Sequence, residues 1–257
     1  MIRLESVAFR YPGAPSPLLR GFSLEVPTGQ FCVIVGASGS GKSTVLRLVN
    51  ALLRPQEGRV RVHGEDTAGA DPIALRRGIG YVPQRGGLLP HMTARENAAL
   101  VPRLMGWKPE DARAAAEEAL ATVQLPAPAY GDRYPDELSG GQRQRVAVAR
   151  ALAARPGVVL MDESFGALDN ALREELQDEL GPLMRRLGKT VLFVTHDMHE
   201  AVHMADRLVV MDAGRILADG TPAEVVLGAK DPVVERLLGR RRKDLERFVR
   251  EKEDVHG

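Results

Sequence analysis

The chain has one cysteine, almost no net charge and no long apolar run. The lone Cys32 cannot form an internal disulfide, and because it falls inside an apolar stretch we interpret it as a small buried residue rather than a reactive thiol. The 35 Lys and Arg against 34 Asp and Glu leave a formal charge of +1, which argues against general nucleic-acid binding. No apolar run approaches the roughly 18 residues of a membrane span, and the first residues lack a signal peptide, so we expect a cytoplasmic chain.

A glycine-rich loop follows the apolar run Phe31–Val35 and leads into a helical pattern from Lys42 to about Leu53. Its residues are Gly36, Ala37, Ser38, Gly39, Ser40, Gly41, Lys42, Ser43 and Thr44. Strand, loop and helix in this order are typical of a phosphate-binding loop, in which glycines let backbone N–H groups surround a phosphate. We expect Lys42 to reach the β- and γ-phosphates of a nucleotide and Ser43 to bind Mg²⁺. An accidental glycine-rich turn is the alternative.

Two carboxylates end the most apolar strand, Val158–Met161. Such a pair is costly to bury unless it faces a cation or a reacting water. We therefore assign Asp162 to Mg²⁺ and Glu163 to the role of general base, the alternative being two acidic residues that cap the next turn. His196 follows another buried strand, Thr190–Val194, at the edge where α/β sheets bind ligands, so it is a candidate to hold the γ-phosphate and the attacking water.

Ser139 and Gln142 stand at the N-cap and third positions of a predicted helix and form a capping box. The intervening Gly140 and Gly141 are unnecessary for capping, and they leave the helix N-terminus bare enough for a phosphate to approach. A well-capped helix start without a ligand is the plainer interpretation.

The rest of the pattern predicts an α/β chain. We expect a strand at Ile2–Phe9, a hairpin of Phe22–Val26 with Gln30–Val35, and a second hairpin around Asp212–Gly214. A long helix, Ala171–Leu187, is expected to be interrupted at Gly181–Pro182. Tyr11 is either a core or edge tyrosine or the ring on which a nucleobase stacks.

Further helices are predicted elsewhere in the chain. Thr93 with Glu96, and Thr221 with Glu224, form capping boxes. The final segment, residues 240–257, is densely charged with apolar residues on one stripe, and we interpret it as a solvated or packing helix rather than a membrane-surface helix.

Taken together these ordered motifs resemble the nucleotide-binding subunit of an ATP-binding cassette (ABC) transporter, over Met1 to about Gly228. The resemblance implies a P-loop NTPase with a RecA-like core, an antiparallel β subdomain and an inserted helical subdomain over about 85–154, the ATPase domain covering 1–239. It implies that Tyr11 stacks on adenine, that Gln84 senses Mg²⁺ and the membrane partner, and that the motif Ala167-Leu168-Asp169 places Asp169 across a dimer. The Ser139 motif would complete the ATP site of a second copy.

A finer likeness is to the ATPases of glycine betaine, carnitine and choline importers, carried by residues 87–93, 96–107, 165–169 and 220–224. It implies membrane permease subunits and a substrate-binding protein as partners, no nucleic acid, and a peripheral place on the cytoplasmic face of the membrane. Ser164 departs from the proline usual in the family. Many members carry C-terminal regulatory domains, and we expect none here because the sequence ends at Gly257. An ATPase for another solute, an exporter, or a soluble ABC ATPase acting on DNA or ribosomes are the alternatives.

Overall fold

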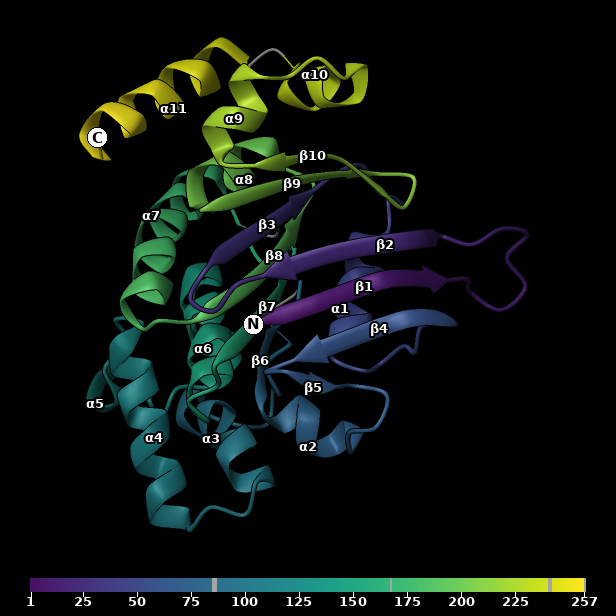
Figure 1. Cartoon of the computed structure of the whole chain (residues 1–257). Coiled ribbons are helices and arrows are strands. Elements are labelled where there is room, and N and C mark those ends of the chain that lie inside the picture. The colour runs from purple at the N-terminus through teal and green to yellow at the C-terminus, as the bar shows by residue number, and fades with distance from the viewer. Residues whose placement is uncertain (85–86, 167, 240–241, 257) are drawn as a thin grey trace. The chain divides into compact units, whose positions relative to one another are not determined.

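The computed structural model describes residues 1–84, 87–166, 168–239 and 242–256 (Figure 1). These fall into two compact units, one formed by Met1–Ala70 and Gln177–Gly257 and the other by Asp71–Leu176. The bounds predicted for the inserted helical subdomain stay a prediction, and its first residue, Arg85, lies outside the described residues.

An antiparallel sheet in the first unit contains the N-terminal strand. Its order is β2-β1-β4-β5, formed by β1 (Ile2–Phe9), β2 (Leu19–Val26), β4 (Glu57–Val62) and β5 (Glu65–Asp66). In β1 the register shifts between Leu4 and Val7, where Ser6 has a left-handed φ of 48°. This bulge changes which side chains face inward, so that Ile2 and Leu4 before it and Val7 and Phe9 after it are all buried.

A parallel arrangement in the same unit surrounds β3 (Phe31–Val35), which pairs with β8 (Thr190–Thr195) on one side and β9 (Arg207–Asp212) on the other. All five residues of β3 are buried, as expected for a strand covered on both faces. The predicted hairpin of residues 22–26 with 30–35 is therefore wrong. The first of these segments alternates buried and exposed residues and pairs with β1 instead.

The second predicted hairpin is confirmed, because β10 (Arg215–Gly220) pairs antiparallel with β9. Its turn places Ala213 and Gly214 at positive φ, the geometry that suits a tight two-residue connection. Helices α1 (Lys42–Val49) and α8 (Met198–Met204) complete this part of the unit.

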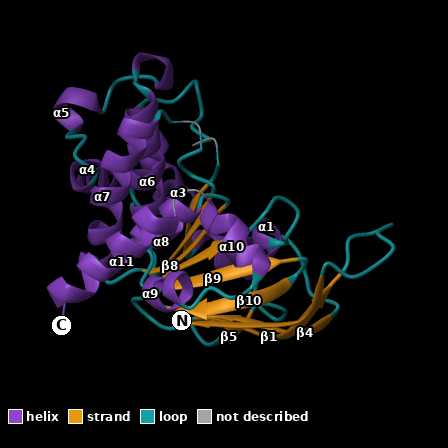
Figure 2. Ribbon diagram, turned by 90° about the horizontal axis from the view of Figure 1, so that it is seen from above, coloured by secondary structure: helices purple, strands orange, loops and turns teal. Residues whose placement is uncertain are grey.

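The second unit is mainly helical. Its elements are α2 (Pro72–Arg77), β6 (Ile79–Val82), α3 (Ala94–Leu104), α4 (Pro109–Thr122), α5 (Ala127–Tyr130), a 3-10 turn at Pro135–Glu137, α6 (Gly140–Leu152) and β7 (Val158–Asp162). Helices α3, α4 and α6 pack together (Figure 2). Strands β6 and β7 are parallel and in register from Ile79 opposite Val158 to Val82 opposite Met161.

Helix α7 (Asn170–Arg186) spans the division between the units and runs without a break through Pro182. The predicted interruption at residues 181–182 is thus wrong. Proline removes one helical hydrogen bond, but its neighbours Leu180, Leu183 and Met184 are buried, and that packing keeps the helix continuous.

The C-terminal part of the first unit is helical: α9 (Pro222–Leu227), α10 (Pro232–Leu238) and α11 (Arg242–His256). Thr221 and Glu224 form the predicted capping box on α9. Gly239 ends α10 with a positive φ of 55°. The predicted tail starts at residue 240, which with 241 and 257 lies outside the described residues.

Cys32 is completely buried, and burial raises the pKa of its thiol to about 12, which confirms the interpretation as an inert core residue.

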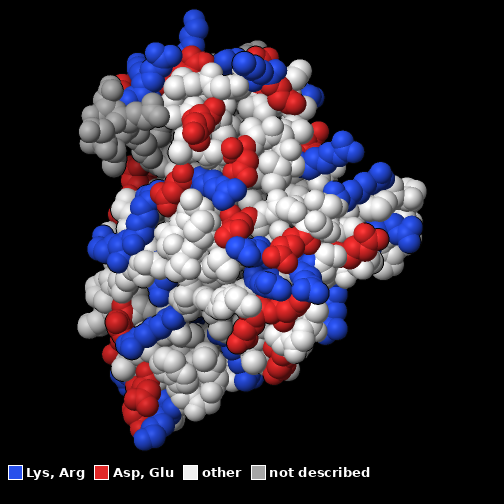
Figure 3. All heavy atoms as spheres, in the orientation of Figure 1, with Lys and Arg blue, Asp and Glu red and all other residues white. Residues whose placement is uncertain are grey.

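On the face drawn in Figure 3 acidic and basic side chains are interspersed, without a large area of one sign. Within the described ranges, no helix combines the length and apolar character that crossing a membrane requires.

Candidate functional site

The glycine-rich loop lies where the sequence predicts it, between the end of β3 at Val35 and the start of α1 at Lys42. Gly39 and Gly41 adopt positive φ angles of 81° and 107°, which residues other than glycine rarely adopt. At Gly36 an added Cβ atom would collide with the backbone carbonyl oxygen of Met211 on β9. The path of the loop therefore depends on its glycines.

The ammonium of Lys42 and the hydrogen-bond donors of this loop suit an anion. Lys42 is 4% exposed, and its Nζ donates to the carbonyl oxygens of Gly36 at 2.7 Å and Ala37 at 3.0 Å. Helix α1 has no acidic residue in its first turn and no side-chain cap at its N-terminus. The hydroxyl of Ser40 is buried without a hydrogen-bond partner among the described residues. A buried ammonium, an uncapped helix N-terminus and an orphaned hydroxyl together fit a phosphate group.

Tyr11 is anchored to the same helix. Its hydroxyl forms a hydrogen bond with Oγ1 of Thr44 at 3.0 Å, and its ring meets Phe9 edge-on with centroids 4.9 Å apart. The ring is half-buried. Tyr11 is therefore fixed beside α1, where it could present a ring face to a nucleobase.

His196 lies next to the glycine-rich loop because of the strand register. Val35 at the end of β3 pairs with Thr195 at the end of β8, so that Gly36 and His196 are the residues that follow this pair. The carboxyl ends of parallel strands are where such sheets bind ligands. The first unit thus brings together the predicted loop, Tyr11 and an exposed His196.

In the second unit, the parallel register of β6 and β7 likewise brings Gln84 next to Glu163. Both residues lie two positions beyond the paired Val82 and Met161. The Gln84 side chain donates from Nε2 to Oε2 of Glu163 at 3.0 Å. The predicted base and the predicted sensor are therefore in direct contact, which the sequence pattern did not reveal.

Glu163 has a left-handed φ of 43°, which is a strained conformation for a residue with a side chain and costs on the order of 1–3 kcal/mol. Strain of this kind is concentrated at functional sites. Ser164, at the position of the family's usual proline, is 2% exposed, and its hydroxyl donates to the carbonyl oxygen of Val82 at 3.4 Å. This contact ties the residue after Glu163 to the neighbouring strand.

Asp162 accepts a hydrogen bond from the hydroxyl of Tyr81 at 3.3 Å. Tyr81 was not predicted as a site residue, because only the parallel pairing of β6 with β7 places it there. Within the described residues there is no cluster of three or more His, Cys, Asp or Glu side chains that could hold a metal ion. The assignment of Ser43, Gln84 and Asp162 to Mg²⁺ remains a prediction.

The capping box of α6 is confirmed. Gln142 N donates to Ser139 Oγ at 3.2 Å, and Ser139 N donates to Gln142 Oε1 at 3.0 Å. Ser139 is exposed. A Cβ atom on Gly141 would come within 2.8 Å of the Leu172 side chain, so this glycine is also needed for packing against α7. The structure thus adds a packing role that the sequence analysis did not foresee.

Asp169 is exposed, and its Oδ1 accepts from the backbone N of Leu172 at 3.1 Å. It therefore holds the first turn of α7. Ala167, the first residue of its predicted motif, lies outside the described residues.

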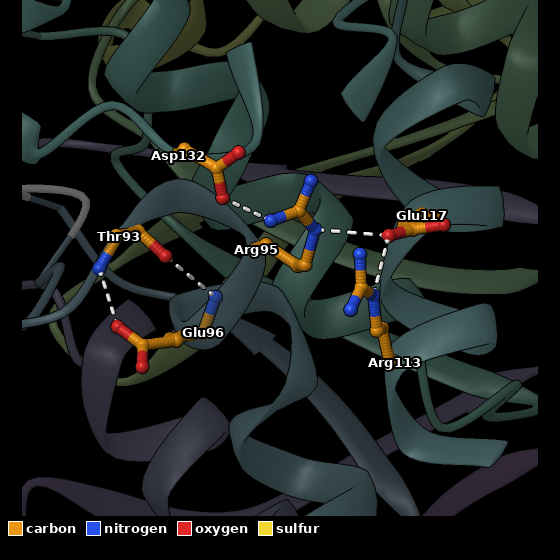
Figure 4. Close-up of polar contacts among 6 residues, drawn as sticks. All are labelled: Thr93, Arg95, Glu96, Arg113, Glu117 and Asp132. Atoms are coloured by element: carbon orange, nitrogen blue, oxygen red, sulfur yellow. Dashed lines mark hydrogen bonds and ion pairs between the residues drawn. The ribbon is translucent and has the colours of Figure 1, made fainter. Parts of the chain in front are cut away.

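The start of α3 carries a dense polar network (Figure 4). Thr93 and Glu96 form the predicted capping box, at 3.3 and 2.9 Å. Arg95 forms ion pairs with Asp132 and Glu117, and Glu117 also pairs with Arg113. The pairs lower the pKa of Glu117, chiefly through the hydrogen bond from Arg113. A cavity of about 560 Å³ is lined by residues of this network together with Ala99, Arg103, Pro109 and Glu110.

Asn97 fixes the loop before α3. Its side chain is fully buried, accepts from Leu89 N at 2.8 Å, and donates to the carbonyl oxygens of Leu89, Met92 and Thr93 at 2.9–3.1 Å. These hydrogen bonds tie part of the segment that the finer likeness singles out, residues 89–93, to helix α3.

Known proteins share this arrangement. The family model described as "ABC transporter" matches residues 19–166, more than half of the chain. The glycine betaine/carnitine/choline transport ATP-binding protein OpuCA of Bacillus subtilis is 44% identical over 255 residues, which cover 99% of this chain and 65% of OpuCA. The sulfate/thiosulfate import ATP-binding protein CysA of Synechococcus elongatus is 44% identical over 221 residues, 86% of this chain and 63% of CysA. The chain spans less than two thirds of the length of these relatives.

Among solved structures, the dimeric post-hydrolysis state of the ATP-binding cassette MJ0796, bound to ADP and Pi, matches with a TM-score of 0.75 and 35% identity. The match covers 86% of this chain and 98% of MJ0796. Both the predicted resemblance and the predicted fold class are confirmed. Because the family model matches more than half of the chain and the solved cassette superposes on most of it, the chain belongs to the ABC transporter family and has the ATP-binding cassette fold.

Proposed function

We propose that this chain hydrolyses ATP to power a membrane ABC importer for osmoprotectants of the quaternary-ammonium type. The observation that carries the proposal is the register of the parallel strands. It sets the phosphate-loop glycines beside His196 in one unit, and it joins Gln84 to Glu163 in the other.

ATP binding is assigned to the first unit. The backbone N–H groups of residues 36–44 and the ammonium of Lys42 receive the phosphates, and Tyr11 stacks on the adenine. The existing bonds of Lys42 to two loop carbonyls support this, because they hold the ammonium inside the loop before a phosphate arrives.

Hydrolysis is assigned to Glu163 and His196. A water attacks the γ-phosphorus, the bond to the β-γ bridging oxygen breaks, and ADP and phosphate leave, while Glu163 takes the proton of the water. The hydrogen bond from Gln84 orients the Glu163 carboxylate. His196 holds the γ-phosphate and the water. Ser43, Gln84 and Asp162 would hold Mg²⁺, which would neutralise the charge of the phosphates when bound.

A second copy of the chain completes each site in this proposal. The exposed Ser139, with Gly140, Gly141 and Gln142, faces the nucleotide held by the partner copy, and Asp169 makes contact across the dimer. ATP thus joins two copies, and its hydrolysis separates them.

We assign contact with the permease to the surface between Gln84 and Trp107, apart from residues 85 and 86, which the structure does not describe. Its internal contacts support the assignment, because Asn97 is hydrogen-bonded to the loop before α3 and Arg95 forms an ion pair with Glu117 on α4. A rigid surface transmits movement between ATPase and permease. The chain would then lie on the cytoplasmic face of the membrane, without entering it.

The cargo is the least constrained part of the proposal. The match to OpuCA covers 99% of this chain and supports an osmoprotectant as the cargo. CysA has the same 44% identity over 86% of this chain, which supports another solute as the cargo. Contacts with the cargo lie on other polypeptides. A transport-coupled measurement is therefore needed to distinguish an osmoprotectant from another solute.

The test is ATP hydrolysis by the chain copurified with its membrane partner in liposomes. Glycine betaine, choline, carnitine, sulfate or thiosulfate is supplied on its binding protein, and the control is the unloaded binding protein. We expect stimulation by one of the quaternary-ammonium compounds. Stimulation only by sulfate or thiosulfate would reject the osmoprotectant assignment and retain the ATPase. No hydrolysis in any condition would reject the ATPase itself.

A further inference from the structure

The C-terminal helix α11 lies outside the residues matched by the ABC transporter family model, and no motif of the sequence explains it. It is nevertheless packed. Leu245 and Val249 are 3% and 2% exposed, and the helix contacts α8 and α9 of its own unit (Figures 1 and 2). The contacts of α11 with α8 and α9 therefore indicate its role.

Phe248 on α11 contacts α8 through a stack of rings. Its ring stacks on His203, with centroids 4.9 Å apart and planes inclined by 21°. His203 in turn stacks on His199, with centroids 6.0 Å apart and planes inclined by 9°. His203 Nε2 also contacts Oδ1 of Asp178 on α7. Residues from α7, α8 and α11, all within the first unit, thus meet at His203.

Helix α8 begins at Met198, two residues after His196, and is hydrogen-bonded to the turn that contains His196. Thr195 donates from Oγ1 to Oε2 of Glu200 at 2.5 Å, and the backbone N of Asp197 donates to Thr195 Oγ1 at 3.0 Å. The Asp197 carboxylate accepts from His199 N at 2.8 Å, which caps α8. Thr195 and Glu200 are buried. A shift of α8 must therefore move His196.

The C-terminal helices also border His196 from the other side. A cavity of about 250 Å³ is lined by residues 196–199 on one side and by Leu237, Leu238 and Leu245 on the other. Leucines of α10 and α11 thus lie close to His196 and to the start of α8.

We propose that Phe248 is a positioning residue for ATP hydrolysis: through His203 and α8 it holds His196 beside the phosphate loop. The C-terminal helix α11 thus stabilises the position of His196 at the end of β8. The inference rests on the proposed ATPase function. Because a misplaced catalytic group can cost up to about 100-fold in rate, loss of the ring is expected to lower kcat by about tenfold. The KM for ATP should stay unchanged, since Lys42 and Tyr11 are not disturbed.

The experiment compares the full-length wild-type chain with Phe248→Ala, Phe248→Tyr and Arg250→Ala. Arg250 is an exposed residue of the same helix and serves as the matched control. We expect a lower kcat at constant KM for Phe248→Ala, nearly wild-type kcat for Phe248→Tyr because the ring is kept, and no change for Arg250→Ala. An unchanged kcat in Phe248→Ala, or a raised KM at constant kcat, would overturn the inference.

Two further measurements separate positioning from general destabilisation. In a His196→Ala background the additional effect of Phe248→Ala should disappear, since both changes act through one group; the same tenfold loss in that background would refute the mechanism. Hydrogen exchange should accelerate in Phe248→Ala at residues 198–204 and not in β9 or β10. If Phe248→Ala does not fold, Phe248→Leu keeps the apolar volume without the ring, and a wild-type kcat in this variant would overturn the inference.

Failure of the inference can be told from failure of the proposed function. A wild-type chain without ATP hydrolysis contradicts the function. An active wild type with an equally active and folded Phe248→Ala variant contradicts only the role of Phe248.

Discussion

Glu163→Gln is expected to lower the rate of ATP hydrolysis by about 10²- to 10⁴-fold, which is the usual contribution of a general base. The substitution keeps the size and shape of the side chain but removes the carboxylate that takes the proton of the attacking water. Gln84 already donates to Oε2 of Glu163, and an amide at position 163 can still accept that hydrogen bond through its oxygen. The geometry around Gln84 should therefore survive while the chemistry is lost.

The measurement is phosphate release in a single turnover, together with equilibrium binding of ATP. Glu174→Gln, at an exposed position of α7, is the control for the loss of one acidic charge. Binding should stay within about twofold of wild type in both variants, well below the tenfold change that 1.4 kcal/mol would produce. Turnover at the wild-type rate in Glu163→Gln would remove Glu163 from the role of base and reopen the assignment of the site.

Lys42→Ala should instead weaken the binding of ATP. Charge-assisted hydrogen bonds contribute about 1.5–3 kcal/mol, so the Kd for ATP is expected to rise about 10- to 100-fold. The loop should keep its path, because that path depends on the left-handed Gly39 and Gly41 and on the close approach of Gly36 to Met211.

Isothermal titration calorimetry with ATP measures the effect, and Lys230→Ala, at an exposed position between α9 and α10, is the matched control. The thermal unfolding of Lys42→Ala without nucleotide shows whether the fold is retained. An ATP affinity equal to that of wild type in a folded Lys42→Ala chain would contradict the phosphate-loop assignment.

Features set by neighbouring residues could be predicted from the sequence. The glycines at 36, 39 and 41 after an apolar strand specified the loop, and the pairs Thr93 with Glu96 and Ser139 with Gln142 specified helix starts. In each case the residues that form the contacts lie within a few positions of one another, so a local pattern contains the information.

Features set by distant residues could not be predicted in this way. The strand at residues 22–26 was paired with its neighbour in sequence, whereas its partner is β1. The bond between Gln84 and Glu163 depends on β6 and β7 lying in register, although the two residues are 79 positions apart in the sequence. The continuity of α7 through Pro182 depends on burial against the rest of the fold, and the stack of Phe248 on His203 depends on how the chain returns after α10.

We propose above all that two copies of this chain share each ATP site and hydrolyse the nucleotide between them. It is tested most directly by phosphate release from Mg-ATP, measured for the wild-type chain over a wide range of chain concentrations. If Ser139 of one copy completes the site of the other, the rate per chain rises with concentration until the dimer is saturated, and Ser139→Ala removes that rise. A rate per chain that is constant at every concentration and unaffected by Ser139→Ala, or the absence of any hydrolysis, would contradict the account.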